Sequence, residues 1–259
     1  MSERSRVFKT PAVVLRRLDY GETDLILTLF TPYYGKLRAI AKGARRPISR
    51  STGHVELYMV TQMVLSRGRD LHIVTQAELE EPFLALSKDL RRIGYASHFA
   101  ELLDRFAVDN QENRQAYDLL VDGLHWLCEE SIDLELAARY YELRLLDVMG
   151  YAPSFFQCAV SGIPLEAEDQ LYSPAEGGVV AAAYATDASN MIPLPLDVFK
   201  LCRYMSRHKW PQVKALRLRP HHHRTLERVL HATLAYILEQ RLQSIAFLRR
   251  ITNLHTDEE

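Results

Sequence analysis

The sequence predicts an α+β chain of two parts, a five-stranded β-barrel over residues 1–82 followed by an all-helical domain over residues 83–259. Apolar residues recur with the period of a strand before Pro82 and with the period of a helix after it. At 259 residues the chain is also long enough to give both parts a core. Residues 151–194 are rich in Pro, Gly and Ser, which predicts an irregular excursion within the helical part.

The barrel prediction depends on five short strands with no long helix between them. Residues 32–35 form a turn, and residues 67–70 form a hairpin loop. Among small closed barrels, the five-stranded Greek-key barrel of oligonucleotide-binding (OB) proteins is the commonest. The predicted strands cover residues 12–18, 24–31, 35–42, 54–66 and 71–79.

The helices are predicted from apolar residues at helical spacing. Ser87, Lys88 and Asp89 can cap the start of the first helix, and Gly150 can cap the end of the third. The polar residues 253–259 are expected to fray. The predicted helices cover residues 86–106, 112–128, 134–149, 196–207 and 223–247.

Composition is that of a globular protein in a reducing compartment. Hydrophobic residues make up 47% and charged residues 25% of the sequence, which excludes a disordered chain. No apolar run is long enough to span a membrane, and the start does not resemble a signal peptide. Cys128, Cys158 and Cys202 are odd in number and far apart, so we expect no disulfide framework and a cytoplasmic location.

The formal net charge of -1 hides three regions of different sign. Residues 1–83 carry 13 Lys and Arg against 9 Asp and Glu, and residues 177–259 carry 12 against 7. Residues 84–176 between them carry only 7 against 17. This asymmetry predicts separate partners for separate regions.

One basic stretch, residues 35–50, carries six cations and no acid. Its first half alternates like a half-buried strand, whereas Gly43 and Pro47 predict that its second half is a mobile loop. Phosphate suits such a surface, because arginine presents a planar fork of donors and stays charged. The alternative is a solvated strand face beside a disordered loop.

Several segments together point to one family. The N-terminal part reads KTPAVVL at residues 9–15, YGETDLIL at residues 20–27 and GKLRAIAKGAR at residues 35–45. The helical part adds YELRLLDVMGYAP at residues 141–153, Cys158, and YSPAEGG at residues 172–178. Through these segments the whole chain resembles the RecO family of bacterial DNA repair proteins, which are recombination mediators.

The resemblance implies an OB barrel, a helical domain and a cytoplasmic, nucleoid-associated protein without enzymatic activity. The implied role is to bind single- and double-stranded DNA, to anneal complementary strands and, with RecR, to load RecA onto DNA coated by single-strand-binding protein. An RNA-binding OB-fold protein and a non-enzymatic adaptor are the alternatives. Comparing the affinities for DNA and RNA of one sequence separates the first, and loss of all nucleic-acid binding favours the second.

A barrel that binds single strands needs cations along the backbone and rings on which bases stack. Tyr20, Tyr33, Tyr34 and Tyr58 are the candidate rings, although tyrosines also close barrel cores. No base-reading pattern is present, so we expect binding without sequence preference. The candidate DNA-binding cations of the barrel are Arg16, Arg17, Lys36, Arg38, Lys42, Arg45, Arg46, Arg50, Arg67 and Arg69.

A second group of candidate DNA-binding cations lies around the start of the last helix: Arg217, Arg219 and Arg224. Annealing requires two anionic strands to be held close with their bases free. A diffuse cationic surface achieves this because it screens the repulsion between strands. A solvated helix start is the alternative interpretation.

Many members of the family carry a zinc site built from two Cys-x-x-Cys pairs. Here Cys158 is followed by Ser161 in place of the second thiolate, and residues 178–184 contain neither cysteine of the later pair. One thiolate cannot supply four zinc ligands, so we predict no metal and no cofactor. By this resemblance residues 151–194 form a degenerate, non-zinc, knuckle-like excursion. The excursion is expected to be held instead by packing of Phe155, Phe156, Leu171 and Val179.

The sequence offers no motif for covalent chemistry. It has no phosphate-binding loop, no Gly-x-Ser-x-Gly elbow and no His-Glu-x-x-His pattern, so no enzyme is predicted. His221, His222 and His223 are interpreted as a basic surface turn and not as metal ligands. The reason is that adjacent side chains on a helix point in different directions.

The acidic middle region suggests protein contacts. The resemblance implies that the helical domain receives the acidic, Phe-ending tail of single-strand-binding protein, which needs an apolar pocket and a cation. Arg139 is the predicted cation, with Arg144 behind it. The alternative for Arg139 is an intrahelical pair with Glu135, worth only ~0.3 kcal/mol. RecR is expected to contact the barrel.

Overall fold

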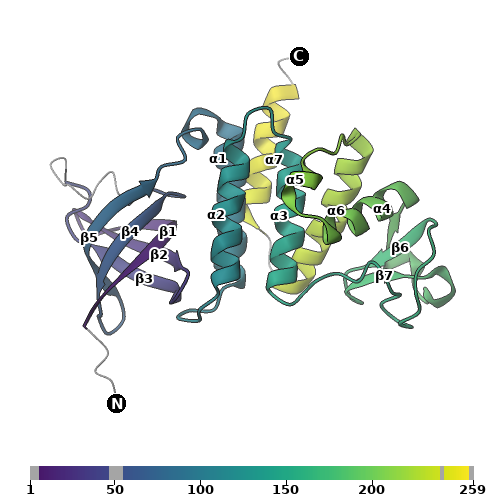
Figure 1. The fold of residues 1–259 in the computed structure, drawn as a ribbon, viewed down its shortest axis with the longest axis horizontal. Coiled ribbons are helices and arrows are strands. Elements are labelled where there is room, and N and C mark those ends of the chain that lie inside the picture. The colour runs from purple at the N-terminus through teal and green to yellow at the C-terminus, as the bar shows by residue number, and fades with distance from the viewer. Residues whose placement is uncertain (1–5, 47–54, 240–241, 257–259) are drawn as a thin grey trace. The chain divides into compact units, whose positions relative to one another are not determined.

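The computed structural model describes residues 6–46, 55–239 and 242–256, and Figure 1 labels most of their elements. Their contacts divide the chain into two compact units, residues 1–129 with 243–259 (unit 1) and residues 130–242 (unit 2). The predicted division at residue 82 follows the change from strands to helices. The contacts, in contrast, group the barrel with the first two helices and the last one.

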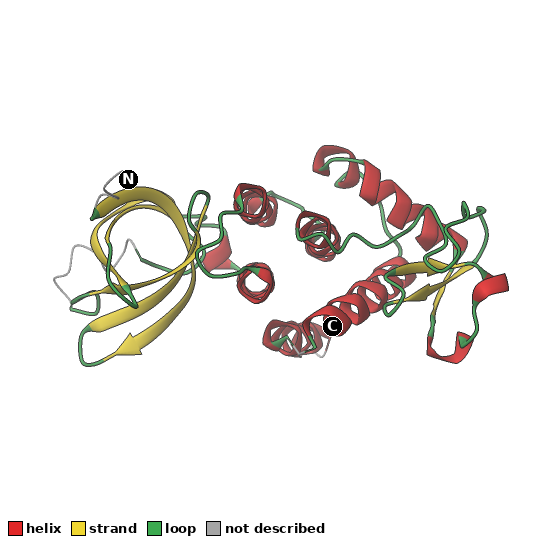
Figure 2. Ribbon diagram, turned by 90° about the horizontal axis from the view of Figure 1, so that it is seen from below, coloured by secondary structure: helices red, strands yellow, loops and turns green. Residues whose placement is uncertain are grey.

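Unit 1 contains a closed five-stranded barrel with the strand order β1-β2-β3-β5-β4. The β3 and β5 strands are parallel, and the other neighbouring pairs are antiparallel. Figure 2 shows these strands curving around a common interior. This is the OB arrangement, so the predicted barrel is confirmed. The strands are β1 (Val7–Tyr20), β2 (Asp24–Thr31), β3 (Gly35–Ala41), β4 (Val60–Ser66) and β5 (His72–Glu81).

The barrel core follows from alternation along the strands. In β2, Leu25, Leu27 and Leu29 are buried, while Ile26 and Thr28 between them are only half-buried. Successive side chains of a strand point to opposite faces, so the strands that fill the interior also build an outer surface. The fourth strand begins later than predicted, because residues 57–58 form a turn before it.

Two helices follow the barrel in unit 1, α1 (Leu90–Phe106) and α2 (Arg114–Cys128). The Asp89 side chain caps α1 by accepting hydrogen bonds from the backbone N–H groups of Arg91 and Arg92, at 2.8 and 3.4 Å. Asn113 caps α2 in the same way, through the backbone N–H of Ala116. Both helices therefore begin within a few residues of the predicted positions.

The predicted helix over residues 223–247 is wrong, because two helices occupy this part of the chain, α6 (Pro220–Leu238) and α7 (Gln243–Thr256). Glu239 adopts a left-handed conformation with φ of 52° and ends α6. The Glu101 carboxylate of α1 then accepts the backbone N–H groups of Gln243 and Ser244, at 2.9 and 2.7 Å. This contact starts α7 on unit 1, although helical periodicity continues through both segments.

Helix α7 packs closely on α1. A Cβ atom at Gly94 of α1 would lie only 2.9 Å from the Cδ2 atom of Leu248, so the absence of a side chain permits the contact. His98 adds a hydrogen bond to the Ser244 hydroxyl at 2.9 Å. The helix extends to Thr256, so residues 253–256 of the tail that was predicted to fray are helical, and residues 257–259 lie outside the described residues.

Unit 2 contains the helices α3 (Leu134–Val148), α4 (Leu196–Arg207), α5 (Trp210–Val213) and α6. The excursion before α4 is less irregular than predicted, because it holds a small antiparallel sheet of β6 (Gln170–Ser173), β7 (Gly178–Val180) and β8 (Ile192–Leu194). Such short strands give no readable alternation. Phe155 and Val179 are buried as predicted, and the Phe155 ring stacks on Tyr172 with centroids 6.0 Å apart.

No helix among the described residues is long and apolar enough to cross a membrane.

Candidate nucleic-acid interface

Two cross-strand rows of side chains cover the outside of β1, β2 and β3. In one row Arg16 lies opposite Thr28, and Thr28 lies opposite Arg38. In the other, Ile26 lies between its partners on β1 and β3. We call these two rows the outer face of the barrel; its members are Arg16, Thr28, Arg38, Leu18, Ile26 and Ile40.

The outer face places cations beside exposed apolar groups. Arg16 and Arg38 are exposed, and Leu18 exposes 62% of its surface. Tyr20, at the end of β1, exposes 54%. A pocket of about 240 Å³ opens here, lined by Arg16, Arg17, Leu18, Ile26, Thr28, Lys36, Arg38, Asp104 and Asp109. Cations next to apolar groups suit a nucleic-acid strand, which presents phosphates and base faces together.

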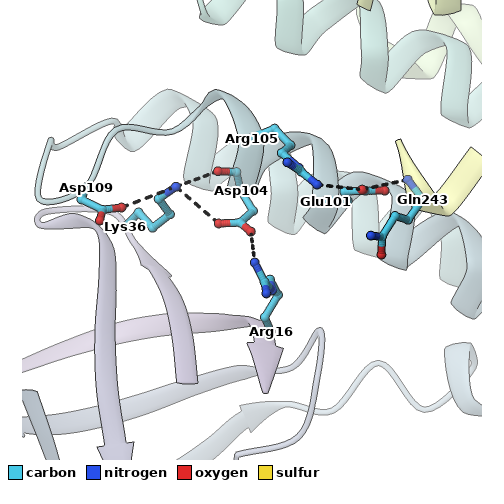
Figure 3. A network of polar contacts seen from close by, with 7 residues as sticks. All are labelled: Arg16, Lys36, Glu101, Asp104, Arg105, Asp109 and Gln243. Carbon is cyan, nitrogen blue, oxygen red and sulfur yellow. Dashed lines mark hydrogen bonds and ion pairs between the residues drawn. The ribbon is translucent and has the colours of Figure 1, made fainter. Parts of the chain in front are cut away.

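The surroundings of Lys36 do not suit its predicted role as a phosphate-binding cation. Figure 3 shows its Nζ atom between Asp104 and Asp109, with an ion-pair distance of 3.4 Å to each carboxylate. The same atom donates to the main-chain oxygen of Asp104 at 2.7 Å, and only 15% of the side chain is exposed. Lys36 thus attaches β3 to α1 and the following loop, and we leave it out of the proposed DNA surface.

The loop after α1 continues this attachment. The backbone N–H of Asn110 donates to the Lys36 oxygen at 2.9 Å. At Gly35, which has φ of +63°, a Cβ atom would lie 1.8 Å from the Gln111 oxygen, so only glycine fits.

The two arginines of β1 are partly matched by acids. Arg16 forms an ion pair with Asp104 at 3.3 Å, but 70% of its side chain stays exposed. Arg17 forms an ion pair with Glu56. Exposed ion pairs of this kind are weak, so the guanidinium of Arg16 remains accessible to a phosphate.

The turn after β3 carries Lys42, Arg45 and Arg46, all exposed. This turn is attached to the start of β2, which differs from the predicted mobile loop. The Asp24 carboxylate accepts the backbone N–H of Gly43 at 2.7 Å, and the Arg45 N–H donates to the Thr23 oxygen at 2.9 Å. Arg45 also forms an ion pair with Asp19 at 3.3 Å. The predicted Arg50 lies outside the described residues.

The β4–β5 hairpin carries the remaining barrel cations, Arg67 and Arg69, and both are exposed. The Arg67 guanidinium lies 4.7 Å from the Phe8 ring centroid and 5.9 Å from that of Tyr34. Burial, together with the nearby charge of Arg67, lowers the pKa of His72. Arg67 is therefore held in place by rings at this end of the barrel.

Only two of the four candidate tyrosine rings are exposed. Tyr20 and Tyr33 each show about half of their surface, whereas Tyr58 is buried. Tyr34 is half-buried against Phe8, with ring centroids 4.4 Å apart. Within the described parts of the barrel, three exposed candidate cations make no ion pair: Arg38, Lys42 and Arg69. We call these three the free barrel cations.

In unit 2, Arg217 lies in the loop before α6, Arg219 precedes its first residue, and Arg224 lies in its second turn. All three are exposed, and none forms an ion pair with a described residue. The structure therefore keeps this predicted group together around the start of α6.

The premise that adjacent histidine side chains point in different directions does not hold for His221 and His222. The Nε2 atoms of His221 and His222 lie 2.8 and 3.0 Å from one Oδ2 atom of Asp197. The hydrogen bond from His221, opposed by slight desolvation and aided by His222, lowers the pKa of Asp197 to about 2. His223 points instead to Asp133 and Glu135 of unit 2. A carboxylate from α4 brings two adjacent rings together, and no sequence spacing reveals that.

This histidine cluster is built for hydrogen bonds. The backbone N–H of Arg219 donates to Nδ1 of His222 at 3.1 Å, so the proton of a neutral His222 ring lies on Nε2 and faces Asp197. A ring that binds a metal through Nε2 normally donates from its other nitrogen. The observed contact is the reverse of that arrangement.

The excursion does not fit the zinc site that the family resemblance implies. The Cys158 thiol is buried, and its Sγ accepts the backbone N–H of Ala181 at 3.4 Å. Ser161 and Ala181 thus stand where further ligands would be needed, and they leave Cys158 as the one thiolate among these residues. Four soft or borderline ligands are not available, so no step of the mechanism involves zinc.

We expect the pKa of the Cys158 thiol to be unusually low. Burial opposes ionisation of its thiol, but hydrogen bonds from Ser161 and from backbone N–H groups outweigh it and lower the pKa of Cys158 to about 7. Because the folded pKa is depressed, the unfolding free energy should rise between about pH 7 and the ordinary cysteine value of about 8.5.

Ultraviolet absorbance of the thiolate, followed against pH, measures this ionisation. Cys202 provides the internal comparison, because burial raises the pKa of its thiol to about 12. A Cys158→Ser variant should lose the thiol ionisation near pH 7 and keep the ionisation near pH 12. A wild-type profile with no ionisation below pH 8 would contradict the expectation.

The two cations predicted to receive a partner tail have different surroundings. Arg139 is buried, with Nη2 at 2.9 Å from Oε1 of Glu142 and Nη1 at 2.8 Å from Nε2 of His231. The predicted alternative, a pair with Glu135, is replaced by this pair with Glu142. Arg144 is one-third exposed and pairs with Asp147 at 3.0 Å. Only Arg144 is thus accessible to a partner.

Together, the barrel, its cation-bearing outer face and the helical region define an OB-fold protein of the nucleic-acid-binding class. Two family models match the chain: Recombination protein O N terminal over residues 1–83, and Recombination protein O C terminal over residues 87–246. The chain belongs to the RecO family of DNA repair proteins.

Individual relatives agree with these family models. The chain is 39% identical over 245 residues to DNA repair protein RecO of Roseiflexus sp. (strain RS-1), covering 95% of this chain and 86% of the relative. It is 35% identical over 257 residues to DNA repair protein RecO of Heliobacterium modesticaldum, covering 98% and 93%. The corresponding protein of Alkaliphilus metalliredigens is 34% identical over 224 residues, covering 86% and 91%.

Proposed function

We propose that this chain is a recombination mediator that binds single- and double-stranded DNA without sequence preference and anneals complementary strands. The observation that carries the proposal is the outer face, where the Arg16–Thr28–Arg38 row lies beside exposed Leu18 and half-buried Ile26. Membership of the RecO family supports the role in DNA repair. No covalent step is part of the proposal.

The chemistry of the outer face explains how binding leaves bases free to pair. Guanidinium and ammonium groups bind phosphate oxygens, which are the same at every nucleotide. Leu18 and Tyr20 offer surfaces to base faces and not to base edges. A strand held in this way keeps its pairing edges exposed, and the cations screen repulsion from a second strand.

The partners belong to the same proposal. We infer that RecR contacts the barrel and that the helical region receives the acidic tail of single-strand-binding protein, so that the complex loads RecA. Arg144 is the proposed cation for that tail, because Arg139 is buried in its own ion pair. Arg217, Arg219 and Arg224 provide the proposed second contact with DNA.

Annealing of complementary strands, one of them coated with single-strand-binding protein, tests DNA contact and partner contact together. Replacing Arg217, Arg219 and Arg224 with glutamate should slow annealing about tenfold, because strand repulsion near α6 is no longer screened. The control replaces Arg6, Lys9 and Lys88, which are exposed cations of unit 1 outside the outer face. An unchanged rate in the first variant would exclude Arg217, Arg219 and Arg224 from the DNA site, and a wild-type chain that neither binds nor anneals DNA would refute the proposal.

A further inference from the structure

Two arginines of α4 stack on one aromatic ring of the excursion. The Cζ atom of Arg207 lies 3.9 Å from the Phe156 ring centroid, and that of Arg203 lies 4.9 Å from it. Arg203 also lies 5.2 Å from the Phe199 ring centroid. Phe199, Arg203 and Arg207 follow one another at i, i+4 spacing, so they share one side of α4. The rings thus fix the orientation of both guanidinium groups.

Neither guanidinium is paired with an acid of the described residues. No carboxylate of the described residues lies within ion-pair distance of Arg203 or Arg207. Acids nearby in sequence make other contacts: Asp169 accepts the backbone N–H of Leu196 at 2.8 Å, and Asp197 accepts His221 and His222. A structural role in an ion pair is therefore excluded for both arginines within the described chain.

The surrounding segment is unusually basic. Residues 198–226 contain eight Lys and Arg residues and no Asp or Glu. The segment spans α4, α5 and the start of α6, all within unit 2. Its cations are Lys200, Arg203, Arg207, Lys209, Lys214, Arg217, Arg219 and Arg224. A field of one sign over this length suits a polyanion better than a ligand with one or two charges.

We propose that Phe156, Arg203 and Arg207 form a second binding site for single-stranded DNA, separate from the outer face of the barrel. A guanidinium that lies flat on a ring keeps its N–H edges free, and these edges can bind phosphate oxygens in a bidentate way. Arg207 is exposed, so the opposite face of its guanidinium can receive a stacked base. This site rests on the proposed DNA binding and adds residues that the sequence prediction did not contain.

A second site gives annealing a physical basis. One chain then holds one strand on unit 1 and another on unit 2. Each strand meets the other at a high effective concentration, whereas two free strands must meet by diffusion. The contacts with the Phe156 ring also explain why Arg203 and Arg207 need no acid as a partner.

The test counts short oligonucleotides bound per chain. Isothermal titration with an oligothymidine of about eight nucleotides, the length that one OB site accommodates, should give two bound per wild-type chain. Replacing Arg203 and Arg207 with glutamine should leave one bound. The matched control, Arg6→Gln with Lys9→Gln, removes the same charge from exposed positions of unit 1 and should still bind two.

Two milder variants separate a binding role from a folding role. Arg203→Lys with Arg207→Lys keeps the charge but loses the planar fork, and Phe156→Leu keeps apolar volume but loses the ring. Each should bind two oligonucleotides, with the weaker affinity reduced about fivefold. Thermal unfolding shows whether the glutamine variant is folded. If it is not, wild-type affinities in both milder variants would overturn the site.

The remaining outcomes are distinct. A wild-type chain that binds no oligonucleotide refutes the proposed function itself. A wild-type chain and a glutamine variant that bind the same number, with equal affinities, refute the second site and leave the proposed function standing. If the glutamine variant loses binding of a glutamate-rich peptide and not of DNA, the arginines are a carboxylate site and the inference is overturned.

Discussion

Replacing Arg38, Lys42 and Arg69 with glutamine is expected to weaken binding of a single-stranded oligonucleotide by about 100-fold at low ionic strength. These free barrel cations are exposed and make no ion pair with described residues, so they break no existing ion pair when they bind a phosphate. Each contributes about 1 kcal/mol, and about 3 kcal/mol corresponds to somewhat more than 100-fold in affinity.

The dependence on salt identifies the cause of that loss. For single strands, log K falls against log salt with a slope of about -0.7 for each phosphate neutralised, so about six contacts predict a slope near -4. Losing three contacts should make the slope less negative by about 2. Fluorescence anisotropy over a range of salt concentrations measures both quantities.

Replacing Arg6, Lys9 and Lys88 with glutamine provides the control, because it removes the same net charge from exposed positions that are not among the candidate DNA-binding cations. Its affinity should fall by less than about threefold, since only the long-range field changes. Equal losses in the two triple variants would show that net charge acts without a localised site, and the free barrel cations would then not form the binding site.

Replacing Arg139 with methionine is expected to lower the free energy of unfolding by about 3–5 kcal/mol, the largest effect on stability that we predict. Glu142 has no exposed surface, and Arg139 Nη2 lies 2.9 Å from its Oε1. The substitution leaves a buried carboxylate without its cation. It also removes the donor at 2.8 Å from Nε2 of His231.

Two variants test that explanation. Arg144→Met breaks an ion pair with Asp147 on the same helix, and because that pair is exposed the cost should stay below about 1 kcal/mol. Arg139→Met with Glu142→Leu removes both buried charges and should recover most of the lost stability. Urea unfolding can be followed through Trp210, whose ring lies 5.5 Å from Tyr140. A loss below about 1 kcal/mol in Arg139→Met would show that the pair is not structural, and Arg139 would again be a candidate for the partner tail.

Predictions that rest on local patterns agree well with the structure. The strand at residues 24–31 and the helix at residues 196–207 have the predicted bounds, because side-chain alternation and helical spacing are fixed by the chain itself. The family segments predicted the barrel, and the family models agree. The acid-free segment over residues 198–226 was also readable, and it would have pointed to Arg203 and Arg207.

The sequence by itself therefore determined the five barrel strands, the first four long helices, the family and the positions of the cations. The tertiary structure alone decided which cations are available: Lys36 and Arg139 are matched by Asp104 and Glu142, while Arg38 stays exposed. It also decided that Glu101 starts α7 on unit 1 and that Phe156 lies under two arginines. The reason is physical: the availability of a charge depends on which acid, ring or backbone group lies within a few ångströms of it, and folding brings those groups from distant parts of the chain.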